Sequence, residues 1–87
     1  MKDPSPLEFP TTFPIKVVGQ HSPEFQVAVV EIMRRHIPDL ADEQMTTRPS
    51  AGGKYIAITA TFVATSREQL DNLYRELSAH ELVVMLL

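Results

Sequence analysis

Cysteine is absent from this sequence of 87 residues, and neither sign of charge is in large excess. Without cysteine the chain can form no disulfide, no thiolate nucleophile and no cysteine–zinc site. Its 8 Lys and Arg against 11 Asp and Glu give a net charge of −3, which argues against nucleic-acid binding because that binding needs a basic surface. No run of residues approaches the ~20 apolar positions of a membrane span.

The beginning of the chain also lacks the features of a targeting segment. Residues 1–6 carry two prolines and no apolar stretch behind their single lysine, so we predict a disordered tail and no signal peptide. The expected compartment is therefore the cytoplasm. Residues 7–87 are predicted to form a single domain, since a chain this short holds one core. Leu7 and Phe9 are expected to lie against that core, with a partner-binding strand as the alternative.

Hydrophobic periodicity predicts the elements of this domain. Apolar residues at helical spacing predict one helix from Pro23 to about Ile37, with Ser22 as its N-cap. A second helix is predicted from Thr65, which forms a capping box with Glu68, to about residue 79. Alternating patterns predict strands at 13–18, 43–48, 54–64 and 82–87, with Gly19 breaking the first strand.

This order of strand, helix, strand, strand, helix, strand predicts a fold of the α+β class. Two β-α-β units that share one sheet give the ferredoxin-like βαββαβ sandwich, a four-stranded antiparallel sheet with both helices on one face. The first and third strands are expected in the centre of the sheet. The predicted core consists of Ile15, Val17, Val29, Ile32, Ile56, Ile58, Phe62, Leu70, Leu73, Leu77 and Val84.

The other face of this sheet has no helix to cover it. The alternation predicts that it carries Lys16, Val18, Tyr55, Ala57, Thr59, Thr61, Val83 and Met85. Such a face can be a solvated antiparallel surface rich in threonine. It can also be the interface with a second copy or with another protein, because contiguous exposed apolar surface usually has a use. We expect the interface.

The segment that joins the first strand to the first helix is a candidate ligand site. It consists of Gly19, Gln20, His21 and Ser22. Glycine permits close approach of the backbone, and free N–H groups at a helix N-terminus favour a small carboxylate ligand such as an amino acid. The alternative is a capped turn that binds nothing.

Motifs for catalysis, metals or cofactors are missing. The histidines are His21, His36 and His80, and none has a ligand partner at a metal-binding spacing. The sequence Gly52-Gly53-Lys54 lacks the rest of a phosphate-binding loop and leads into a strand, so it predicts a β-hairpin, with a weak anion nest as the alternative. Tyr55 alone offers a base-stacking aromatic on the open side, which argues against RNA binding. We therefore predict no enzyme activity, no metal and no cofactor.

Several segments in fixed order resemble the YbeD-like family of small bacterial proteins. They are Leu7–Gly19, Val30–His36, Arg48–Ser50 with Gly53–Tyr55, Leu73–Leu77 and Val83–Leu87. The resemblance implies an unknown function and a fold like that of the ACT domains, which are ferredoxin-like regulatory domains that bind amino acids. It also implies an association with lipoate-attachment genes, but supplies no catalytic residues. We expect a regulatory or adaptor domain that acts through protein contacts, with a carboxylate or amino-acid sensor as the alternative.

Overall fold

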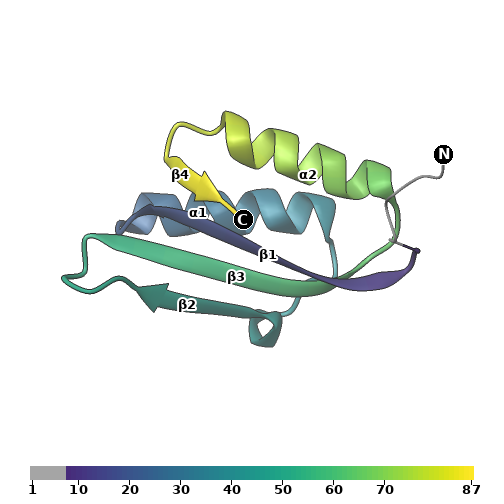
Figure 1. Ribbon diagram of the computed structural model, residues 1–87, viewed down its shortest axis with the longest axis horizontal. Helices are drawn as coiled ribbons and strands as arrows, with labels where there is room; N and C mark the ends of the chain where they lie inside the picture. The colour runs from purple at the N-terminus through teal and green to yellow at the C-terminus, as the bar shows by residue number, and fades with distance from the viewer. Residues whose placement is uncertain (1–7) are drawn as a thin grey trace, which may run out of the picture.

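The computed structural model describes residues 8–87, which fold into one antiparallel sheet and two long helices (Figure 1). The strands lie in the order β2-β3-β1-β4, so β1 and β3 are central, as predicted. This is the ferredoxin-like arrangement expected from the sequence. The predicted tail, residues 1–6, and Leu7 lie outside the described residues. The elements are β1 (Thr11–Gln20), α1 (Pro23–His36), η1 (Asp42–Gln44), β2 (Met45–Pro49), β3 (Tyr55–Ala64), α2 (Arg67–Ala79) and β4 (Val83–Leu86).

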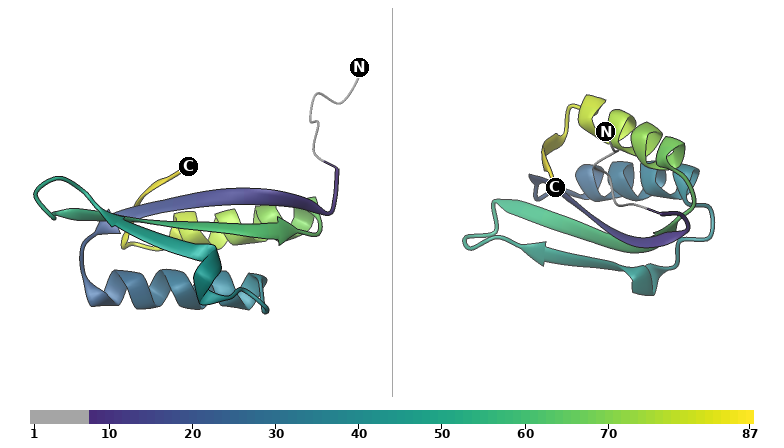
Figure 2. Two further views of the ribbon diagram at one scale, coloured as in Figure 1. Left: turned by 90° about the horizontal axis from the view of Figure 1, so that it is seen from below. Right: turned by 45° about the vertical axis from the view of Figure 1, so that its right-hand side comes forward.

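Both helices cover the same face of the sheet, as the left view of Figure 2 shows. The core between the layers includes every predicted core residue except Val84, and adds Phe25, Met33, Ile37, Leu40, Ala60 and Ala64. Phe9 packs against this core, as expected. Helix α1 begins as predicted, because Ser22 Oγ accepts a hydrogen bond from the Phe25 N–H at 3.2 Å.

The cap of α2 lies one residue later than predicted. Ser66, and not Thr65, is the N-cap, and its hydroxyl accepts a hydrogen bond from the Gln69 N–H at 3.0 Å. The Gln69 side chain in turn accepts from the Thr65 N–H at 2.8 Å. Two adjacent hydroxyl residues and two possible partners, Glu68 and Gln69, left the sequence pattern ambiguous by one position.

We predicted that Gly19 breaks the first strand, but the strand continues through it. It is a buried position inside β1, opposite Ile56 on one side and Val83 on the other. A Cβ atom at this position would lie 2.3 Å from Cε1 of Phe25 and 2.6 Å from the carbonyl oxygen of Leu82. Glycine is therefore required here because the Phe25 ring packs directly on the strand backbone.

The last strand differs from the prediction on both of its faces. Gly19 pairs with Val83 and Val18 with Met85, so a β-bulge inserts one extra residue at this point of β4. As a result Val83 turns toward the helices and packs against the core, although we predicted it on the open face. Val84, which we predicted in the core, is 58% exposed. A strict alternation cannot foresee such a shift of register.

Pro14 occupies the fourth position of β1, inside the strand. Lys16 exchanges both backbone hydrogen bonds with Leu87, at 3.1 and 2.8 Å, so the even-numbered residues of β1 direct their N–H and C=O groups toward β4. β4 is only four residues long and pairs no further than this. The nitrogen of Pro14 therefore faces the edge of β1 beyond the end of β4. The lack of an N–H there removes no hydrogen bond of the sheet.

Candidate functional site

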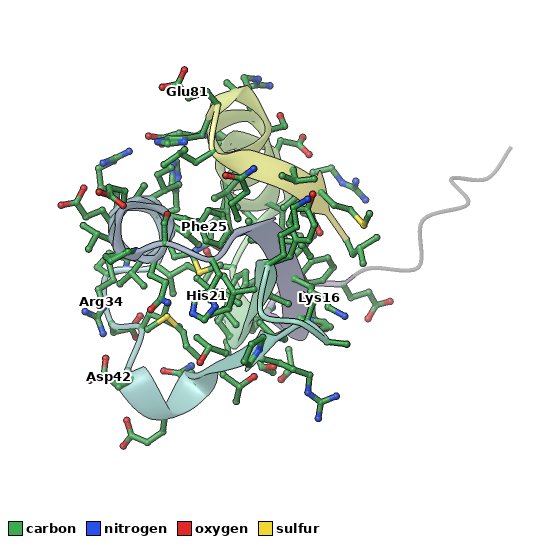
Figure 3. The ribbon with its side chains drawn as sticks, turned by 90° about the vertical axis from the view of Figure 1, so that its left-hand side faces the viewer. Lys16, His21, Phe25, Arg34, Asp42 and Glu81 are labelled. Atoms are coloured by element: carbon green, nitrogen blue, oxygen red, sulfur yellow. The ribbon has the colours of Figure 1, made fainter. Side chains whose placement is uncertain are left out.

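The open face is the side of the sheet that the helices leave bare. The strand register places seven of the eight predicted residues on it, and Val83 is the exception described above. Lys16 and Thr61 are exposed and Met85 is 51% exposed, whereas Tyr55, Ala57 and Thr59 are half-buried. Figure 3 shows Lys16 on the opposite side of the sheet from Phe25, which belongs to α1.

Among the residues of this face that were missing from the predicted set, two lie on β2. Thr46 pairs with Thr59 and Arg48 pairs with Ala57, so both side chains share the open face with Lys16. Alternation within 43–48 already placed Thr46 and Arg48 on one side of their strand. Which side that is depends on the turn between β2 and β3, where Gly52 and Gly53 have φ values of 88° and 73°.

The open face has a hollow over Ala57, which we call the Ala57 hollow. The methyl side chain of Ala57 lies directly between Val18 on β1 and Arg48 on β2, so larger neighbours rise on both sides of it. The volume is about 200 Å³. Its lining consists of Lys16, Val18, Arg48, Pro49, Ser50, Tyr55, Ile56 and Ala57.

A second hollow adjoins the first along the sheet. It has a volume of about 360 Å³ and shares Lys16, Arg48 and Ala57 with the Ala57 hollow. Thr46, Thr47 and Thr59 complete it. The two depressions together form a shallow trough across β1, β3 and β2, with the same two cations beside both.

The charge of the open face is of one sign. The strand positions that face this side include Lys16 and Arg48 and no Asp or Glu. Within residues 8–87, neither cation forms an ion pair. A third cation, Lys54, lies with its Nζ atom 5.6 Å from the centre of the Tyr55 ring at the border of the hollow. The face therefore has an excess of positive charge in a protein whose net charge is −3.

The basic residues in the last turn of α1 have the opposite property, since they are paired. Arg34 pairs with Asp42, and Arg35 pairs with Glu76 across the two helices. His36 Nε2 lies 2.7 Å from the other oxygen of Glu76. Burial lowers the pKa of His36, and the neighbouring charge of Arg35 lowers that pKa further. Neutral His36 can donate its Nε2–H to the carboxylate, so this cluster joins α1 to α2 without a charged imidazole.

The four residues of the predicted carboxylate site have different surroundings and partners. Gly19 is buried beneath the Phe25 ring, while Gln20 is exposed and pairs with Tyr55. The His21 Nδ1 atom lies 3.2 Å from the Gly53 carbonyl oxygen, and Ser22 caps α1. At the start of α1, Pro23 has no N–H to offer and the Phe25 N–H is used by the cap. The site stays a prediction from the sequence, with no supporting geometry.

The part of the chain that the structure describes offers neither a metal site nor a membrane-spanning helix. No group of three or more His, Cys, Asp or Glu side chains is arranged there to hold a metal ion. Neither of the long helices within residues 8–87, of 14 and 13 residues, is long and apolar enough to cross a membrane.

Comparison with known proteins places the chain in a family. A family model described as "Protein of unknown function (DUF493)" matches residues 4–87. The chain belongs to the DUF493 family. The UPF0250 protein of Leptothrix cholodnii is 49% identical over 86 residues, which are 99% of this chain and 94% of that protein. The UPF0250 protein of Neisseria gonorrhoeae is 49% identical over 81 residues, 93% of this chain and 89% of the relative. These matches confirm the resemblance to the YbeD-like family of bacterial proteins of unknown function.

Solved structures show the same fold in other small domains. Protein HP0495 from H. pylori superposes with a TM-score of 0.71 over 99% of this chain and 89% of its own, at 12% identity. The C-terminal domain of the MgtC protein from Mycobacterium tuberculosis superposes with a TM-score of 0.67 over 87% and 82% of the two chains, at 21% identity. At these identities the likeness shows the ferredoxin-like fold alone.

Proposed function

We propose that this DUF493 protein is a non-enzymatic adaptor or regulatory domain of the cytoplasm, and that it binds an acidic segment of a partner protein on its open face. The observation that carries the proposal is that Lys16 and Arg48 form no ion pair within residues 8–87 and lie on a hollowed surface whose described strand positions include no Asp or Glu. The partner supplies acidic side chains, which the described strand positions of the open face do not include.

The apolar content of the face favours a protein as its occupant. Val18, Val63 and Met85 lie on it, and Val63 and Met85 are 55% and 51% exposed. A sheet face designed only for water usually carries alternating charged side chains instead. A protein segment can cover these apolar groups while its carboxylates meet the cations, and a specific interface needs only about 800 Å² on each partner.

Charge makes a second copy of the chain a poorer occupant. In a two-fold dimer built face to face about an axis near Ala57, Lys16 and Arg48 of one copy would meet the same cations of the other. Like charges brought together at an interface cost several kcal/mol. The homodimer that the sequence left open is therefore an outcome of the test and not the proposed state.

The chemistry of the hollow supports binding and not catalysis. Its lining contains the hydroxyl groups of Ser50 and Tyr55 and the Lys16 amine, but no histidine or carboxylate, which are the commonest general bases. The Ser50 Oγ atom accepts a hydrogen bond from the Tyr55 N–H at 3.0 Å, so it serves the turn between the two strands.

Charge reversal tests the proposal. Arg48→Glu should abolish capture of the partner from a lysate of the source bacterium, whereas Arg75→Glu should not. Arg75 is the matched control, because it is also exposed and donates only to Asn72 of its own helix, on the other side of the molecule. Cross-linking and mass spectrometry should then locate the captured segment next to β3 and find Asp or Glu within it.

Three results would overturn the proposed function. One is equal capture by both variants, and another is a cross-linked segment without acidic residues. The third is a stable dimer in sedimentation that Arg48→Glu strengthens by removing repulsion, since the open face would then belong to a second copy.

A further inference from the structure

The Ala57 hollow has the shape of a receptor for one side chain. Ala57 is the smallest side chain on the open face of β3, and its neighbours on that face of the same strand are Tyr55 and Thr59. About 200 Å³ corresponds to roughly seven water-sized groups. This space suits the five heavy atoms of a glutamate side chain beyond its Cα.

The lining of the hollow is divided between apolar and cationic groups. Val18, Pro49 and Ala57 supply apolar surface that a methylene stem can contact. Arg48 stands directly beside Ala57 in the ladder, and Lys16 stands diagonally across from it beside Thr59. The planar guanidinium of Arg48 can donate two parallel hydrogen bonds to a carboxylate, and Lys16 adds a point charge.

We infer that the Ala57 hollow recognises the side-chain carboxylate of a single Glu or Asp of the partner. The methylene stem lies over Ala57 and Val18, and the carboxylate lies between Arg48 and Lys16. This inference rests on the proposed function of the open face and names the chemical group that binds in the hollow. Exposed ion pairs alone contribute little to affinity. Specificity therefore arises from the combination of charge and a cavity of limited size.

A titration with small molecules tests the hollow without any partner. Butyrate has the aliphatic stem and carboxylate of a glutamate side chain, and butyramide is its neutral counterpart of nearly the same shape. In amide NMR spectra of the full chain, butyrate should cause saturable shifts centred on Ala57. Butyramide should bind about tenfold or more weakly, since a hydrogen bond to a charged group contributes about 1.5–3 kcal/mol.

Matched variants separate the cavity from the charge. Ala57→Leu fills the hollow without a change of charge and should abolish the saturable shifts. Thr61→Leu, on the same face of the same strand but outside the hollow, should leave them unchanged. Arg48→Gln should weaken butyrate binding about tenfold. Because the spectra themselves show whether each variant is folded, Arg48→Gln keeps the test decisive if Ala57→Leu does not fold.

Several outcomes would overturn the inference. They are a linear response to butyrate without saturation, equal binding of butyramide, shifts centred elsewhere, or binding retained in Ala57→Leu. Saturable binding of inorganic phosphate without binding of butyrate would also overturn it. Partner capture that depends on Arg48, together with no butyrate binding, would reject the hollow and retain the proposed function. Butyrate binding without capture of any acidic partner would reject the proposed function and retain the hollow as a carboxylate site.

Discussion

The two faces of the sheet are made from the same strands but carry different chemistry. On the face under the helices, β1 and β3 present large apolar side chains such as Ile15, Ile58 and Phe62, each at most 1% exposed. On the open face the same strands present threonine, small apolar residues and Lys16. The covered face belongs to a close-packed core, and the open face is a shallow surface.

The treatment of charge separates the two sides further. Arg35 and His36 share the carboxylate of Glu76 between the helices, and Arg34 pairs with Asp42. Lys16 and Arg48 on the other side have no such partner within residues 8–87. Exposed ion pairs contribute only ~0–1 kcal/mol, so stability does not require pairing at either place. The difference teaches that cations on the open face are available to another molecule at almost no cost in stability.

The largest effect should follow from a change at the closest approach on the covered face. Gly19→Ala would place Cβ against the Phe25 ring and the Leu82 carbonyl, at 2.3 and 2.6 Å. Because the carbonyl belongs to the backbone, it cannot move aside freely. We expect a loss of about 3 kcal/mol in the free energy of unfolding, measured by urea denaturation.

A second glycine provides the control for this change. Gly53 has a φ of 73° and no atom within 4 Å of the position that a Cβ would take. Gly53→Ala should therefore cost only ~1–2 kcal/mol, the penalty for a left-handed conformation. If the two substitutions cost the same, the packing of Phe25 on β1 is not as tight as described.

An intermediate effect should distinguish the two valines at the bulge of β4. Val83 packs against the core and Val84 is 58% exposed. Val83→Glu should lower the free energy of unfolding by about 1–3 kcal/mol, because it brings a carboxylate toward apolar surroundings. Val84→Glu should change it by less than about 0.5 kcal/mol. The opposite ranking in thermal denaturation would show that β4 follows the simple alternation after all.

This bulge marks the limit of what the sequence can predict about the fold. The order of elements, the central positions of β1 and β3 and most of the core follow from periodicity, because both faces of those strands are long and well patterned. β4 has four residues, all apolar, so alternation carries no information there. Likewise, Gly19 reads as a strand breaker until the position of the Phe25 ring is known, which only tertiary packing decides.

The candidate site was predictable to a similar degree. Alternation within β1 and β3 places Lys16, Tyr55, Ala57 and Thr59 on one face without knowledge of their neighbours. Arg48 could not be assigned, since it reaches this face only through the register that the turn at Gly52 and Gly53 imposes on β2. The hollow itself arises because Arg48 stands next to Ala57, so it cannot be predicted from either residue alone.

The smallest effect concerns pH and should arise in the helix layer. Burial and the charge of Arg35 lower the pKa of His36 below its unfolded value of about 6.5. Between the two pKa values the unfolded chain binds more protons than the folded one, so the free energy of unfolding rises with pH in that interval. The nearby carboxylate of Glu76 does not reverse this order, because it is shared with Arg35 and is 38% exposed.

We therefore expect the contribution of His36 to stability to be complete above about pH 7 and to fall as the pH drops below about 6.5. The free energies of unfolding of the wild type and His36→Gln should differ most at high pH, and the difference should shrink on acidification. Glutamine can still donate to Glu76 but does not titrate, so it isolates the proton. Proton NMR of the His36 ring should give a midpoint below 6.5. A midpoint above 6.5 would show that Glu76 dominates the site, and His36 would then stabilise the contact between α1 and α2 as a cation.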